Sequence, residues 1–166
     1  MKETTTQLHR LQVQGVENID QQTINEVGSW LRLAYLTCAI LAGIGTLLAA
    51  PIFLWALVPL AAAGALSAVH PIDWVYNTFI RRFTGTQSLP KRGVPARFAC
   101  GVGSILLIVT GFAFYSGATT AGYILGASLF AVAFLVGTTD ICIPSIIFRL
   151  ATGRSDMLMS TSTHSN

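Results

Sequence analysis

Charged residues are scarce in this sequence. They make up 10% of its 166 residues, whereas a soluble globular domain carries about 25%. Four long stretches hold no formal charge except Arg32, namely 30–50, 52–69, 98–115 and 123–136. A bilayer core of ~30 Å requires about 20 apolar helical residues and excludes unpaired backbone polar groups. The stretches therefore predict a multi-span helical membrane protein and argue against a soluble domain.

Motifs of familiar soluble enzymes are also missing. The chain has no Gly-rich phosphate loop, no HExxH helix and no G-x-S-x-G elbow, so nucleotide-binding and hydrolase functions have no motif to support them. The polar N-terminal segment carries charges of both signs and does not have the form of a cleaved secretory signal. Any activity is therefore expected within or beside the membrane helices.

The three cysteines are too few and too scattered for a disulfide framework. A metal site built from His70, Cys100, Cys142 and Asp140 has suitable ligand types but lacks the paired spacing of zinc motifs. We therefore expect no metal and no cofactor.

The apolar stretches predict an all-α integral membrane four-helix bundle made of two antiparallel hairpins. We expect spans at about 29–49, 52–69, 96–115 and 119–138. Ala50 and Pro51 alone separate the first two stretches, so this hairpin must turn tightly. The membrane domain is expected over 20–151, with polar, disordered tails at 1–19 and 152–166.

Basic residues predict the orientation of the bundle. The chain has ten Lys and Arg and a net charge of +3, and five of the basic residues lie in the loop between the second and third spans. Short basic loops stay in the cytoplasm, which explains the charge better than nucleic-acid binding does. We expect a multi-pass protein of the bacterial inner membrane with both termini in the cytoplasm.

Between the second and third spans, an interfacial amphipathic helix is expected at about 73–84, with Asp73 as its N-cap after Pro71. Its apolar side chains recur at helical spacing opposite Arg81 and Arg82. We expect an anchor in the lipid headgroup layer. The alternative is a lid packed over the bundle.

Small residues indicate how the spans pack. Gly122 and Gly126 form a GxxxG pair in the fourth span, and Ala99 with Gly103 forms a similar pair in the third. Such pairs let helix backbones approach closely in lipid. They support compact packing without deciding between packing inside the bundle and a homo-oligomer.

The segment after the fourth span contains the strongest candidates for chemistry. Asp140 is an ionisable group near the end of a neutral span, a position that is costly unless the group is solvated, paired or used. A cap for a short interfacial helix explains Asp140 at least as well as catalysis does. In the functional interpretation, Asp140, Cys142 and Ser145 meet Cys100 and His70, and nearby positive charge activates a thiol. Cys38 lies in mid-span and is interpreted as a packing residue.

Three segments resemble a known family: INEVGSWLRLAYL, PKRGVPARFACGVG and GTTDICIPSIIFRL. Together they resemble an uncharacterised family of small bacterial four-helix membrane proteins, domain of unknown function 4395, over roughly residues 20–151. Family members often end in a Cys-x-x-Cys element whose first position corresponds to Cys142, whereas Ser145 stands at the second here. The resemblance thus implies a more limited thiol or sulfur chemistry, in which one sulfur forms a mixed disulfide or carries a persulfide. Cys100 is a candidate for the missing partner thiol.

Three functions follow as hypotheses. The first is a non-enzymatic accessory or assembly component, whose partners are the lipid bilayer and a second membrane protein or another copy of the chain. The second is a thiol or sulfur relay at Cys142, served by a thioredoxin-like protein or a sulfurtransferase. The third is a subunit of a small-solute transporter or channel, for which the spans offer little polar lining.

Overall fold

The computed structural model describes residues 21–152, and that part of the chain is helical without strands. This confirms the all-α fold. The expected tails lie outside the described residues, apart from Thr152. The helices in chain order are α2 (Gln21–Leu47), α3 (Pro51–Leu66), α4 (Pro71–Val75), the π-helix η1 (Tyr76–Ile80), α5 (Arg81–Thr84), α6 (Val94–Tyr115), α7 (Thr119–Thr139) and α8 (Ile143–Ala151).

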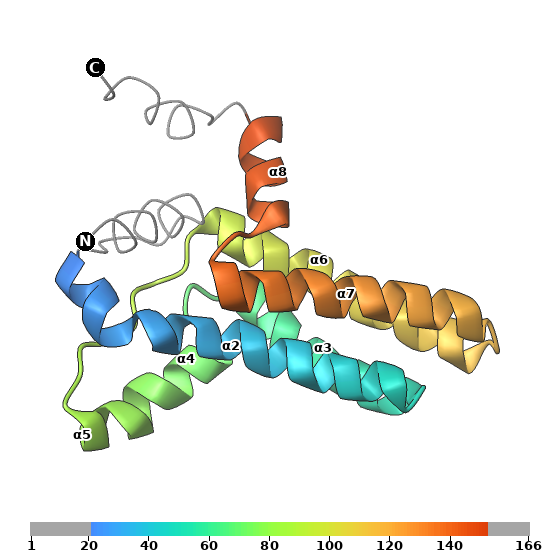
Figure 1. Cartoon of the computed structure of the whole chain (residues 1–166), viewed down its shortest axis with the longest axis horizontal. Coiled ribbons are helices and arrows are strands. Elements are labelled where there is room, and N and C mark those ends of the chain that lie inside the picture. Colours follow the sequence, from blue (N-terminus) through green and yellow to red (C-terminus); the bar gives the residue numbers. More distant parts are fainter. Residues whose placement is uncertain (1–20, 153–166) are drawn as a thin grey trace.

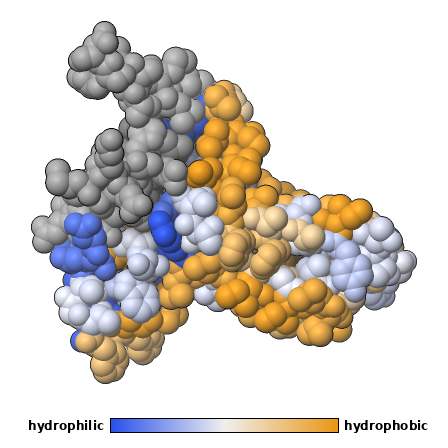
Figure 2. Space-filling view, in the orientation of Figure 1, coloured by the Kyte–Doolittle hydropathy of each residue, from blue (hydrophilic) through white to orange (hydrophobic). Residues whose placement is uncertain are grey.

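The long helices form the body of the molecule (Figure 1). α2 packs along α7, α3 packs along α6, and α6 packs against α7. A core of apolar side chains joins the four helices, and it consists of Ala42, Leu54, Ala61, Leu107 and Leu129. Figure 2 shows hydrophobic residues over much of the body's surface, as expected for helices in contact with lipid.

Three helices are long and apolar enough to cross a membrane alone: Asn25–Leu47, Val94–Tyr115 and Thr119–Thr139. α3 has 16 residues, which is about 24 Å of helix and short of a ~30 Å bilayer core. It qualifies as a span only together with Pro71–Thr84, from which it is bent by 80°. The described residues thus contain three helices able to cross a membrane, or four if the bent pair is one span, which is compatible with a multi-pass membrane protein.

Small residues bring α2, α6 and α7 close together. A Cβ atom added to Gly126 would overlap the side chain of Thr46 on α2, and one added to Gly122 would meet the ring of Phe114 on α6. The GxxxG pair is therefore used for packing inside the bundle. Gly103 has no atom near its missing Cβ, so the similar pair in α6 does not serve the same purpose.

The segment after α3 differs from the expected helix at 73–84. The helix begins at Pro71, and His70 is its N-cap because its side chain accepts a hydrogen bond from the Ile72 N–H. Asp73 is therefore not the cap. It is a buried residue of the first turn.

One side of this segment packs on α2, rather than the whole apolar face lying in lipid. Tyr76 is buried in a cluster with Val27, Leu31 and Leu89, and its ring centroid lies 4.9 Å from that of Trp30. Other apolar residues of the segment are exposed, namely Trp74, Val75, Phe79 and Phe83. The segment thus combines a face docked on the bundle with an exposed aromatic face.

Candidate functional site

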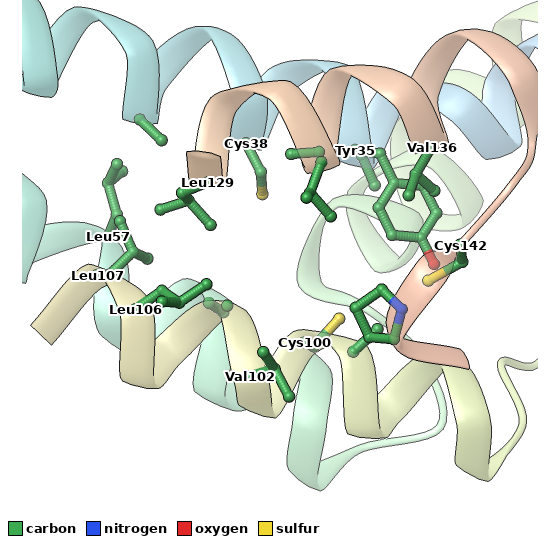
Figure 3. Close-up of a pocket in the computed structure, with 18 of the residues that line it drawn as sticks. Tyr35, Cys38, Leu57, Cys100, Val102, Leu106, Leu107, Leu129, Val136 and Cys142 are labelled. Atoms are coloured by element: carbon green, nitrogen blue, oxygen red, sulfur yellow. The ribbon is translucent and has the colours of Figure 1, made fainter. Parts of the chain in front are cut away.

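An apolar cavity of about 220 Å³ lies between α2, α3, α6 and α7 (Figure 3). Leucine and valine side chains form most of its wall, including Leu57, Leu106, Leu107, Leu129 and Val136. Its polar lining comes from the thiols and from Tyr35, His70 and Arg92. The cavity thus joins an apolar interior to a small group of reactive or hydrogen-bonding side chains.

All three cysteines of the chain line this cavity as free thiols. Cys38 comes from α2, Cys100 from the first half of α6, and Cys142 from the connection between α7 and α8. The structure therefore brings Cys100 and Cys142 to one cavity. It also places Cys38 at the cavity, whereas the mid-span position of Cys38 predicts a packing residue. Nothing in the local sequence distinguishes a cavity-lining cysteine from a packed one.

Cys142 is the N-cap residue of α8, and only 2% of its surface is exposed. Pro144 occupies the first turn, where a proline is well tolerated because the N–H it lacks has no helical partner. Burial raises the pKa of the Cys142 thiol, while a hydrogen bond from the Ser145 backbone N–H acts in the opposite direction. Burial is the larger effect, and the charge of Arg92 also acts to lower the pKa.

Ser145 is fully buried and forms a hydrogen bond with the backbone of α6. Its hydroxyl donates to the carbonyl oxygen of Pro95 at 3.0 Å. This bond ties the start of α8 to the start of α6. Ser145 therefore holds the Cys142 segment against the bundle.

His70 and Cys100 both lie beside Gly64. A Cβ atom on Gly64 would lie 2.9 Å from His70 Nε2 and 3.3 Å from Cys100 Sγ, so the glycine makes room for both. His70 Nδ1 accepts the Ile72 N–H at 3.3 Å, which leaves the proton of the neutral ring on Nε2. Burial, and then the charge of Arg92, lowers the pKa of His70 to about 4. At neutral pH His70 is an uncharged donor next to Cys100.

A buried ion pair lies beside the cavity. Arg92 Nε donates to Asp73 Oδ2 at 2.5 Å and Arg92 Nη2 donates to Asp73 Oδ1 at 2.9 Å. The two side chains are only 3% and 2% exposed. The guanidinium also lies over the ring of Tyr35, 4.6 Å from its centroid. Arg92 thus joins α2 to the segment after α3, a role that its place in a basic loop did not reveal.

Asp140 has a structural partner and lies outside the cavity lining. It ends α7 in the left-handed conformation, with φ of 56°. Both its carboxylate oxygens accept from Arg32 Nε at 3.0 Å, and Arg32 Nη2 contacts the same carboxylate. Asp140 is therefore paired, and the cap of the following helix is Cys142 instead.

Tyr35 is a cavity residue that no sequence pattern singles out. Its side chain faces the cavity near Cys142 (Figure 3). Its hydroxyl is buried and has no hydrogen-bond partner among the described residues. A single tyrosine in an apolar span carries no pattern that predicts such a position.

The arrangement offers thiols and neutral donors rather than a metal site. Within residues 21–152, no three His, Cys, Asp or Glu side chains are grouped so that they would hold a metal ion. The two acidic residues near the cavity, Asp73 and Asp140, are each bound to an arginine. The cavity offers thiols, the hydrogen-bond donors of Tyr35 and His70, and Arg92, whose charge Asp73 balances.

Comparison with known proteins places the chain in a family. No curated protein and no solved structure matches it. The model of the family described as "Domain of unknown function (DUF4395)" matches residues 26–152, which include every helix from α3 to α8 and most of α2. The chain therefore belongs to the DUF4395 family.

Proposed function

We propose that this protein is a membrane thiol protein in which Cys142 carries sulfur and Cys100 is its exchange partner. One observation carries the proposal: the chain has only three cysteines, far apart in sequence, and all three line one cavity. Packing alone gives no reason for thiols from α2, α6 and the start of α8 to converge. The apolar wall also protects reactive sulfur from water.

The proposed reaction is the exchange of a sulfane sulfur between thiols. Cys142–SH reacts with a hydropersulfide, R–S–SH, to give Cys142–S–SH and R–SH, and the thiol proton of Cys142 passes to the departing sulfur. Cys100–SH then takes the outer sulfur in the same way and returns Cys142 to the thiol. Each step breaks one S–S bond and forms another, so no external oxidant is needed. The His70 N–H beside Cys100 stabilises negative charge that develops on sulfur.

The surroundings of the thiols indicate which class of sulfur donor can react with them. Because leucine and valine side chains form most of the cavity wall, a charged aqueous reagent is a poor substrate. A neutral hydropersulfide enters an apolar cavity more readily than an anion does. A sulfurtransferase as supplier and a thioredoxin-like protein as acceptor are the partner classes that this chemistry requires.

Persulfide transfer is testable by intact-protein mass spectrometry. The full chain in lipid nanodiscs is exposed to an alkyl hydropersulfide, and we expect a mass gain of one sulfur atom that dithiothreitol reverses. Cys142→Ser should abolish the gain, whereas Cys38→Ser, a matched change in the same cavity, should retain it. Equal loading of the Cys142→Ser protein would refute the assignment.

An accessory or assembly role is the second candidate function. The observation in its favour is the exposed aromatic face of the segment after α3, formed by Trp74, Phe79 and Phe83. Large exposed apolar patches mark partner or membrane contacts. If cells that carry Cys142→Ser grow like wild type while Phe79→Ser with Phe83→Ser causes a defect, this role replaces the thiol relay. The mostly apolar wall of the cavity favours a transporter or channel less.

We further propose that the end of the bundle carrying α5 and α8 faces the cytoplasm of a bacterial cell. The described basic residues near the membrane lie at this end, and the turns after α2 and α6 carry no charge. A reporter fused after Asn166 should therefore be active only on the cytoplasmic side, and one inserted after Gly117 only outside. The opposite pattern would reverse the orientation.

A further inference from the structure

The Tyr35 hydroxyl is buried and has no hydrogen-bond partner among the described residues. A buried hydroxyl without a partner is unfavourable because it has lost its hydrogen bonds to water and gained none in return. The side chain lines the cavity. Arg92 contacts the ring face of Tyr35 and is itself held by Asp73. An acceptor inside the cavity would satisfy the hydroxyl.

The size and wall of the cavity limit the occupant. An engineered apolar cavity of about 150 Å³ holds benzene, and this cavity measures about 220 Å³, which leaves room for one ring with small substituents. Water requires two to four polar partners, and the wall is mostly apolar. A ring compound that partitions into lipid fits better than a polar solute.

The polar groups at the wall favour a neutral acceptor. Tyr35 offers an O–H and His70 offers the N–H of Nε2, whose ring is neutral at pH 7. The carboxylates of Asp73 and Asp140 are bound to Arg92 and Arg32, so no free carboxylate is offered to a cation. Arg92 also lines the cavity, and Asp73 balances its charge. The wall therefore presents hydrogen-bond donors without net charge, which matches a neutral carbonyl oxygen.

We propose that this cavity binds a lipid-soluble, single-ring carbonyl compound of the quinone class, with the Tyr35 hydroxyl as hydrogen-bond donor to a carbonyl oxygen. The binding uses no thiol. It therefore does not depend on the sulfur exchange proposed above, and either proposal can fail alone.

Two probes isolate the hydrogen bond. Duroquinone and durene share a ring with four methyl groups and differ in the two carbonyl oxygens. All ring carbons of duroquinone are substituted, so addition of the cysteines to the ring is disfavoured. Equilibrium binding of each radiolabelled probe is measured with the full chain in nanodiscs, and empty nanodiscs are subtracted. Wild type should bind duroquinone more tightly than durene.

The variants test the role of Tyr35 and the location of the site. Tyr35→Phe removes an unpaired buried hydroxyl and should fold at least as well as wild type. It should weaken duroquinone binding about five- to tenfold, the effect of one hydrogen bond, and leave durene binding unchanged. Ala133→Leu, which fills the cavity, should reduce binding of both probes, whereas Ala131→Leu at an exposed position of α7 should reduce neither.

Three results would overturn the proposal. The first is no duroquinone binding above that of empty nanodiscs, as expected if the cavity holds only water. The second is unchanged duroquinone affinity in Tyr35→Phe. The third is equal affinity for the two probes, which would make the cavity a purely apolar site.

Discussion

The two ends of the helical bundle are held together by different interactions. At one end, α2 turns into α3 through Leu48, Ala49 and Ala50, and α6 turns into α7 through residues 116–118, with no charged residue in either turn. At the other end, the ion pairs Arg92–Asp73 and Arg32–Asp140 join segments that are 19 and 108 positions apart in sequence. Figure 2 shows the most hydrophilic described residues on this side.

The two ends differ because they hold different kinds of segments in position. Two antiparallel helices joined by a short turn are positioned by the turn and by close backbone packing, as at Gly126. The charged end must also hold the segment after α3, the loop at 85–93 and α8, none of which spans the bundle. Directional hydrogen bonds between charged groups fix such elements in one arrangement.

The largest expected effect is the loss of the buried pair at the charged end. Asp73→Asn leaves Arg92 buried without a counter-charge, which should destabilise the protein by about 3–5 kcal/mol. The measurement is the apparent melting temperature in detergent. The double variant Asp73→Leu, Arg92→Met removes both charges and should recover most of the loss. A single variant as stable as wild type would mean that the charged end does not depend on this pair.

Packing inside the bundle gives the next largest effect. Gly126→Ala places a methyl group against the Thr46 side chain, whose hydroxyl is already bound to the Ala42 carbonyl oxygen at 2.8 Å. Overpacking of this kind costs about 1–3 kcal/mol. The matched control is Gly103→Ala, which enters open space and should be neutral or slightly stabilising. Equal melting temperatures for the two variants would contradict the prediction that close packing of α2 on α7 at Gly126 stabilises the protein.

The charged end should also respond to acid through His70. The folded protein lowers the pKa of His70 from 6.5 to about 4, so between these values the unfolded chain binds a proton that the folded chain does not. Stability therefore falls as the pH drops below about 6.5, on the order of 2 kcal/mol at pH 5. His70→Asn keeps a cap acceptor without this titration and should flatten the dependence of melting temperature on pH. A wild-type curve that coincides with the His70→Asn curve would contradict this origin.

The smallest effect is expected at the second ion pair. Arg32 is 32% exposed while Asp140 is 5% exposed, so water can solvate Arg32 when its partner is lost. Asp140→Asn preserves a residue type that tolerates positive φ and should cost about 1 kcal/mol or less. The difference from wild type should shrink in high salt. A loss of stability as large as that caused by Asp73→Asn would contradict the prediction that the Arg32–Asp140 pair contributes less than the Arg92–Asp73 pair.

Some features of the site were predictable from the sequence. The depth of Cys100 in its span and the place of Cys142 after the next span indicate the same end of the bundle, because neighbouring antiparallel helices bring those positions level. The Tyr35 and Cys38 contributions were not predictable, since they depend on the rotation of α2 about its axis. Around Tyr35 and Cys38 the helix is mostly apolar, so no clear hydrophobic stripe indicates that rotation.

The sequence by itself determined the helices, the tight turns and the concentration of charge at one end, because these follow from local hydropathy and from the cost of charge in lipid. Only the tertiary structure decided which charges pair, that Asp73 and Asp140 are held by arginines, and that three thiols and an unpaired tyrosine hydroxyl share one cavity. Those outcomes depend on how whole helices rotate and pack against each other, and side-chain contacts between distant segments leave no local pattern in the chain.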